Sequence, residues 1–504
     1  MSKFFNDPFK LKARNGKIGT EIIAGIVAFA AMCYVLPVNM SILGSEYGMS
    51  MPQQGVFAAT AIVCAIACIV MGILANVPMV LGAGMGMNAF VSFTVGGQMD
   101  FSWQECMILL TVSGIIFLVL SVTPLRQYLM SKFNKNLKLI ISAGLGAFIA
   151  FVGFTNSGII VNDPTGGVPV KMASLDTPGV IISIIALILV FGLLVSKVKF
   201  LSKFALPLIM LVSAIVATIL SSVLASGING TASEIADQWS GLGLVPTPWD
   251  PNSTAQWGFW GDGGLKDVLF FGLISGNNSK SFGEMLVNVF SNPMTYVAIF
   301  SLTFVNLFDT TATLISLGNK LGIIDHETGK IENGNKIILG DAIGSLVCAP
   351  IGTTTVTTFV QSSLAIDMGA KTGITAISTG VMFLLSAFIA PVFSVFTPGC
   401  VTGPALVAVG GIIFVESIKD INWKDFIVPL TAFIGVITMV LTYSLVDGIG
   451  LSLISYVVMM LFAGRHKELN AVLYVLSAVF AVSFVLNTVM ANYEPPTTAN
   501  VLAI

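Results

Sequence analysis

The sequence predicts an all-α polytopic membrane protein, and three observations carry this prediction. Of the 504 residues, 55% are hydrophobic and only 10% are charged, whereas soluble domains carry about 25% charged residues. Apolar runs of roughly 20 residues, the length that spans a lipid bilayer, recur along the chain. Two unusual segments, 79–93 and 352–363, interrupt the pattern at matching places in two halves.

The apolar runs predict fourteen transmembrane segments in two sets of seven. They are expected at 20–44, 55–75, 79–93, 104–123, 138–157, 178–196 and 203–226, then at 294–317, 336–350, 353–366, 372–397, 401–417, 425–444 and 447–464. Residues 1–19 form a basic leader, and the run after them is too long for a signal-peptide core. Residues 227–293 are expected to form an extracellular loop. Residues 465–504 supply a C-terminal extra helix and tail, in which 470–490 is either a fifteenth span or a helix packed on the surface.

The distribution of charge agrees with this topology. With the N-terminus in the cytoplasm, 20 of the 23 lysines and arginines fall in the leader or in the even-numbered, cytoplasmic connections. Only Lys171, Lys266 and Lys280 fall outside. This skew is what the positive-inside rule predicts for a correct count of spans.

The third segment of each set is a poor lipid-facing helix. Gly82, Gly84 and Gly86 weaken a helix by about 1 kcal/mol each, and the threonines of 352–363 favour β structure. Non-helical backbone is tolerated at membrane depth only where it is buried or lines a cavity. Interrupted segments at matching places point to a transporter site between inverted repeats, and seven segments per half make the repeats inverted. Close helix packing through small residues is the alternative for the glycine run.

Asp309 lies in the middle of the apolar run 294–317. An acid at that depth usually faces a cavity and is functional, although a structural buried hydrogen bond is the alternative. For Asp341 a cap or scaffold role and a functional role stay open, and Gln361 is either a structural amide or a site residue. The six cysteines lie within or at the ends of apolar segments without metal-ligand spacing, so we expect apolar core residues and no metal site.

Three stretches resemble signatures of the nucleobase–cation symporters of the xanthine/uracil permease superfamily. They are 84–94 (GMGMNAFVSFT), 304–314 (FVNLFDTTATL) and 341–366 (DAIGSLVCAPIGTTTVTTFVQSSLAI). The nearest branch is the AzgA-like adenine/guanine/hypoxanthine permeases, and the resemblance covers about residues 8–490. Two departures stand out, because the branch usually has acids where this chain has Asn306 and Gln361. A glutamine accepts through one oxygen and donates through its NH₂ group, so the preferred purine stays open.

The resemblance implies a specific architecture. It implies fourteen spans in two inverted repeats, with short strands in segments 3 and 10. It also implies a core domain, formed by residues 20–123 and 294–397, and a gate domain, formed by 138–226 and 401–464. Gate domains of this fold often pair, so a homodimer through the gate domain is expected.

The resemblance also implies a function and a site. The protein would import purine nucleobases (adenine, guanine, hypoxanthine or xanthine) through the plasma membrane, by proton symport with an elevator-like motion of core against gate. It would use no cofactor, and its coupling ion would be the proton rather than sodium. The expected substrate contacts are Asn88, Asp309, Gln361, Thr357 and Thr358, with Phe90, Phe308 and Phe359 as stacking faces or core residues. Asp309 and Asp341 are the proton-coupling candidates.

Other classes of function fit less well. Asp309 and Asp341 lack the Tyr-Asp and Gly-x-Gly-Asp contexts of an intramembrane aspartyl protease, so we do not expect an enzyme. Nothing indicates nucleic-acid binding. An anion transporter or channel of the same inverted-repeat fold is the alternative, although such proteins favour a basic or neutral site. A receptor or purely structural role is a further alternative.

Overall fold

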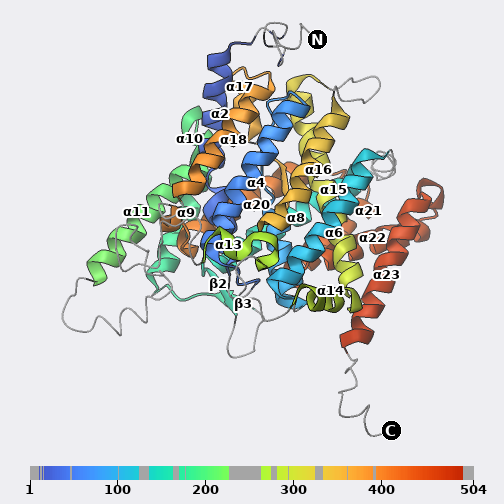
Figure 1. Ribbon diagram of the computed structural model, residues 1–504. Helices are drawn as coiled ribbons and strands as arrows, with labels where there is room; N and C mark the ends of the chain where they lie inside the picture. The colour runs from blue at the N-terminus through green and yellow to red at the C-terminus, as the bar shows by residue number, and fades with distance from the viewer. Residues whose placement is uncertain are drawn as a thin grey trace.

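The protein is a bundle of apolar helices with very little sheet (Figure 1). The computed structural model describes residues 9, 11, 14, 16–45, 48–99, 101–123, 135–162, 170–175, 177–225, 263–273, 281–292, 294–323, 333–359, 361–389 and 393–491. Within these residues, six helices are long and apolar enough to cross a membrane, and one bent pair would add a seventh. Five shorter apolar helices accompany them. The fold is therefore mostly helical and of the membrane type, as predicted.

The elements follow one another along the chain in two stretches. The first comprises α2 (Ile18–Met32), α3 (Val35–Leu43), α4 (Gln53–Leu74), β1 (Leu81–Ala83), α5 (Met85–Ala89), the π-helix η1 (Phe90–Gln98), α6 (Trp103–Val122), α8 (Lys135–Asn156), β2 (Ile160–Asn162), β3 (Val170–Met172), α9 (Pro178–Leu194), α10 (Lys199–Lys203) and α11 (Ala205–Ala225). The second comprises α13 (Leu265–Val268), η3 (Leu269–Gly272), α14 (Phe282–Ser291), α15 (Met294–Leu321), α16 (Gly334–Ile351), β4 (Val356–Thr358), α17 (Ser362–Asp367), α18 (Gly373–Ser386), η4 (Ala387–Ile389), η5 (Ser394–Phe396), α20 (Gly399–Ile418), α21 (Ile427–Leu441), α22 (Leu445–Phe462), η6 (His466–Glu468) and α23 (Ala471–Ala491).

Helix α9 shows why the bundle requires a membrane. Its buried side carries Ser183 and Ala186, while Ile185 and Ile188 on the other side are 53% and 66% exposed. Soluble monomers rarely expose continuous apolar surface of this kind. In a bilayer, lipid tails cover the same side chains, so this apolar surface is not exposed to water.

Two short strands, β1 and β4, replace helix in the interior of the bundle. They pair antiparallel, with Gly82 opposite Thr357, and one further backbone hydrogen bond of 3.0 Å continues the ladder at each end. All residues of both strands are buried. The pairing satisfies backbone groups that would otherwise be stranded in an apolar medium. The strands predicted for segments 3 and 10 are thus present.

The helices pack in two groups. One, the α4 group, consists of α2, α3, α4, α6, α15, α16 and α18 together with β1, β4, α5 and α17. The other, the α8 group, consists of α8, α9, α10, α11, α20, α21 and α22. Helix α23 packs on α22, next to the α8 group (Figure 1).

Direct backbone contact joins α8 to α20, which is the most extensive helix pair in the bundle. A Cβ atom added at Gly146 would lie 2.5 Å from the backbone nitrogen of Phe414, and one added at Gly153 would lie 2.6 Å from that of Val407. Small residues at such a crossing let helices approach without an intervening side chain. The glycine- and alanine-rich sequences of both helices therefore have a structural cause.

The structure differs from the expected elements in three places. The first span is broken between α2 and α3, because Pro37 has no N–H for the carbonyl of Cys33, which instead accepts a hydrogen bond from Leu36. The span expected at 372–397 divides into α18, η4 and η5. Most of the expected loop 227–293 lies outside the described residues, but its end forms α14, whose start is fixed by a capping box between Ser281 and Glu284.

Gly146→Val should destabilise the bundle, because the added side chain has no space between α8 and α20. Overpacking of this kind costs about 1–3 kcal/mol, so the melting temperature of the detergent-solubilised protein should fall by several degrees. Gly192→Val on α9 is the matched control, since nothing lies within 4 Å of a Cβ at that position. Equal melting temperatures for the two variants would contradict this account of the interface.

Candidate functional site

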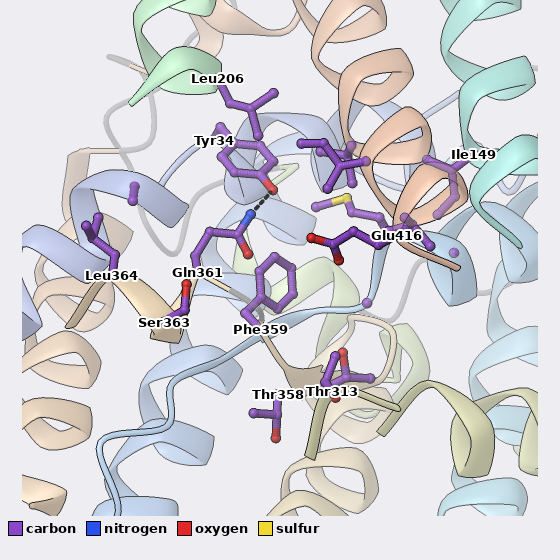
Figure 2. Close-up of a pocket in the computed structure, with 18 of the residues that line it drawn as sticks. Tyr34, Ile149, Leu206, Thr313, Thr358, Phe359, Gln361, Ser363, Leu364 and Glu416 are labelled. Atoms are coloured by element: carbon purple, nitrogen blue, oxygen red, sulfur yellow. Dashed lines mark hydrogen bonds between the residues drawn. The ribbon is translucent and has the colours of Figure 1, made fainter. Parts of the chain in front are cut away.

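A pocket of about 250 Å³ lies between the α4 group and the α8 group (Figure 2). The α4 group contributes the interrupted segments and the end of α2, the α8 group contributes apolar side chains, and both groups contribute charged residues. The described lining residues are Ala31, Tyr34, Gly84, Met85, Gly86, Leu145, Ile149, Leu194, Ser202, Lys203, Leu206, Thr313, Thr357, Thr358, Phe359, Gln361, Ser363, Leu364, Asp367, Val409, Ile412, Ile413 and Glu416.

Four of the predicted site residues line this pocket. Thr357 and Thr358 belong to β4, Phe359 follows it, and Gln361 is the residue immediately before α17. Strand β4 is polar and is paired with β1, and this pairing fixes the positions of the side chains at its end in the pocket lining. The aromatic face of Phe359 and the amide of Gln361 lie side by side in Figure 2.

Asp309 and Phe308 lie in α15, and their side chains are outside the described part of the structure. Thr313 follows Asp309 by four residues in this helix and lines the pocket. Residues four apart lie on the same face of a helix. Position 309 is therefore on the face of α15 that includes a pocket residue, and its role stays a prediction.

Asn88 is fully buried and is not among the described residues that line the pocket. Its Nδ2 donates to Oδ1 of Asn39 at 2.5 Å, and the hydroxyl of Thr354 donates to its Oδ1. Asn39 in turn donates to the hydroxyls of Thr60, at 2.7 Å, and Thr353, at 3.0 Å. In this conformation Asn88 fastens α5 to α3, to α4 and to the segment before β4.

Phe90 is also fully buried, at the start of η1, and it too is absent from the described pocket lining. Asp341 is buried in α16, where its Oδ2 accepts a hydrogen bond of 2.9 Å from the hydroxyl of Thr310 on α15. Asp341 therefore joins α16 to α15 through the residue that follows Asp309 in the chain.

Sequence reasoning missed most of the pocket lining, and two of the missed residues bear on its chemistry. Tyr34, at the break between α2 and α3, accepts a hydrogen bond of 3.1 Å from Nε2 of Gln361. Glu416 on α20 is exposed, and Figure 2 shows its carboxylate directed into the pocket. The sequence feature that could have pointed to Tyr34 is Pro37, three residues later, because a proline interrupts the hydrogen bonds of the first span. No pattern in α20 distinguished Glu416 from an ordinary charge at a helix end.

The mouth of the pocket carries an ion-pair cluster. The carboxylate of Asp367 at the end of α17 lies 2.7 Å from Nζ of Lys320 on α15 and 3.2 Å from Nζ of Lys203 on α10. Partial burial raises the pKa of Asp367, but the two ammonium groups lower it by more, so this pKa lies below its usual range. The Lys203 contact crosses from the α8 group to the α4 group.

Within the described residues, no three His, Cys, Asp or Glu side chains are grouped to hold a metal ion. The six cysteines are all free, and five of them are buried. The pocket thus offers hydrogen-bonding groups, an aromatic face and an ion pair as its chemistry.

Residues 19–445 match the model of the Permease family. Over nearly its full length the chain is similar to the guanine/hypoxanthine permease PbuG of Bacillus subtilis, with 33% identity over 92% of this chain and 96% of that protein. It is also similar to the adenine permease AdeQ of Escherichia coli, with 32% identity over 95% of each chain. These relatives are permeases and not enzymes.

Solved structures show the same fold. The transmembrane domain of a cyanobacterium bicarbonate transporter, BicA, has a TM-score of 0.55 at 13% identity, covering 85% of this chain and 97% of that one. SLC26A9 has a TM-score of 0.55 at 12% identity, covering 90% of this chain and 66% of that one. The chain is thus a multi-pass membrane protein that belongs to the Permease family, and its predicted membership of the xanthine/uracil permease superfamily is confirmed.

Proposed function

We propose that this permease carries purine nucleobases, the class of compound named for PbuG and AdeQ. The observation that carries the proposal is the pocket, which places the ring of Phe359 beside the amide of Gln361 and the phenol of Tyr34. A purine is a flat, apolar ring whose edges carry hydrogen-bond donors and acceptors. It therefore matches an aromatic ring that lies beside an amide and a phenol. The volume of about 250 Å³ lies just below the range of about 300–1,000 Å³ typical of drug-sized ligands, as expected for a small substrate.

We further propose fourteen spans in two inverted repeats, with the α4 group as core domain and the α8 group as gate domain. Two pairings support this. The third segment of each half contributes one strand to the β1–β4 pair, and the fifth segment of each half contributes one helix to the α8–α20 pair. Equivalent elements thus contact each other, as expected of elements that lie next to the pseudo-two-fold axis of an inverted repeat. A homodimer through the gate domain stays part of this proposal.

An elevator-like motion would slide the α4 group against the α8 group. The pocket lies between these groups, and its mouth carries Lys203, Asp367 and Lys320. In the proposed topology this mouth is cytoplasmic. Elsewhere between the groups, the ring of Phe93 packs edge-on against Tyr443, and Thr94 donates a hydrogen bond of 3.1 Å to the Tyr443 carbonyl. The arrangement is that expected of a transporter open toward the cytoplasm.

Proton coupling is assigned to Asp309. An acid within an apolar span is costly, and such residues serve as proton relays in transporters. Asp309 lies one residue from Thr310, which holds Asp341. Protonation of Asp309 together with purine binding would permit the motion, with the proton rather than sodium as coupling ion and Asp341 as the second candidate.

The alternative is an anion transporter, because BicA and SLC26A9 share the fold. The pocket argues against it. Lys203, the lysine among the described lining residues, is paired with Asp367. Glu416 adds a second carboxylate to the lining. Among the described residues, Lys203 and Lys320 are balanced by Asp367 and Glu416, so an anion would meet no net positive charge, whereas a neutral nucleobase would not be repelled.

Cells that lack their own purine permeases should accumulate radiolabelled purine when they express this protein. Asp309→Asn should reduce accumulation to background while the protein stays folded and inserted, because the proton-binding group is lost. Asp447→Asn is the matched control, since it removes an acid from α22 that is not among the described pocket residues. Gradient-driven uptake by Asp309→Asn at the normal level would overturn the coupling assignment, and no uptake by the unaltered protein would overturn the function.

Gln361→Glu should change which purines compete for uptake, since a carboxylate only accepts hydrogen bonds whereas the amide also donates. At least one of adenine, guanine, hypoxanthine and xanthine should change its inhibition constant about tenfold relative to the others, which corresponds to about 1.4 kcal/mol. An unchanged order and spacing of the four inhibition constants would count against a contact by this residue.

Lys203→Ala should alter the maximal transport rate more than Lys320→Ala. Both variants remove one partner of Asp367, but only the Lys203 pair joins the two helix groups. Pairs this exposed contribute at most about 1 kcal/mol, so the expected change is up to about fivefold. Equal effects of the two variants on initial rates at saturating purine would show that the Lys203 pair does not restrain the motion.

A further inference from the structure

Tyr34 lines the pocket from the short break between α2 and α3. Its side chain is buried, and the residue is 3% exposed. The break in the helical hydrogen bonds arises at Pro37, as described above. Figure 2 shows its hydroxyl directed at the amide of Gln361.

The backbone of Gln361 is fixed, whereas its side chain is held by Tyr34. Its carbonyl accepts a hydrogen bond of 2.9 Å from Leu364 as α17 begins, and its side chain makes no capping bond to that helix. The amide Nε2 instead donates to the Tyr34 hydroxyl at 3.1 Å. The amide oxygen then lies on the side of Phe359 (Figure 2).

The two residues together present one acceptor and one donor. With its NH₂ group bound to Tyr34, Gln361 offers the pocket its oxygen. The Tyr34 oxygen accepts that bond, and among the described residues its O–H has no acceptor, so the O–H is left to donate. Buried tyrosine hydroxyls usually find a partner, and here a ligand can supply it.

We propose that Tyr34 is a specificity-determining residue that positions Gln361, and that the pair binds a ligand edge with an N–H donor next to an acceptor. This inference rests on the proposed function and narrows it to ligands with a lactam or amidine edge. Oxo-purines and amino-purines both have such edges. A glutamate at 361 would instead accept a hydrogen bond from the O–H of Tyr34 and leave the ligand only acceptors, so the glutamine selects a different ligand edge from the one a glutamate would select.

The test is competition against radiolabelled hypoxanthine uptake by hypoxanthine and its 1-, 7- and 9-methyl derivatives. In the unaltered protein, methylating the nitrogen that meets Gln361 should weaken inhibition at least tenfold. In Tyr34→Phe, the freed amide can rotate and the donor is lost, so this penalty should fall below about threefold while inhibition by hypoxanthine itself weakens about tenfold. A solely structural tyrosine would change expression or rate but not the ratio between the methylated and unmethylated ligands.

Tyr443→Phe is the matched control, because it removes a hydroxyl bonded to Thr155 that is not among the described pocket residues. Its ligand ratios should equal those of the unaltered protein. If Tyr34→Phe does not fold, Gln361→Met provides the test instead. This variant removes the acceptor and should abolish the loss of inhibition that methylation causes. Unchanged ratios in a folded Tyr34→Phe or Gln361→Met variant would overturn the inference, whereas an unaltered protein that no purine inhibits would overturn the proposed function itself.

Discussion

The antiparallel pairing of β1 with β4 is the constraint on which the rest of the structure depends. A membrane interior cannot hydrate backbone groups, so a chain may leave the helical conformation there only if another segment satisfies it. Here the two interrupted segments satisfy each other through the Gly82–Thr357 register and the bonds beside it. Because both segments are interrupted at the same place, a pocket that carries polar groups can exist inside an apolar bundle, and Phe359 and Gln361 at the end of β4 line it.

Two kinds of packing hold this arrangement. Around the strands, buried amides and hydroxyls fasten the broken segments, with Asn88 bound to Asn39 and Thr354 and with Asp341 bound to Thr310. Such networks stabilise a unique arrangement when every member is satisfied. Between α8 and α20, glycines bring two backbones into contact. The α4 group is therefore built on polar bonds around a site, and the α8 group on close helix packing.

The pocket lies where the two groups meet, so a shift of one group against the other would rebuild its walls. Two polar contacts described above join the groups. They are the Lys203–Asp367 ion pair at the mouth and the hydrogen bond from Thr94 to the Tyr443 carbonyl elsewhere. Exposed ion pairs of this kind are weak. A weakly joined interface around a small polar pocket is consistent with transport, in which the site must open alternately on two sides.

The sequence by itself determined the membrane class and the two segments that could not be lipid-facing helices, because apolar length and glycine or threonine content act locally. It also identified Thr357, Thr358, Phe359 and Gln361 as neighbours of a site. Only the tertiary structure decided what those residues contact. Tyr34 is 327 positions from Gln361 in the chain, Asn88 proved bonded to Asn39, and Glu416 reached the pocket from α20. Hydrogen bonds between distant segments depend on how helices pack, and no local pattern in the chain records that packing.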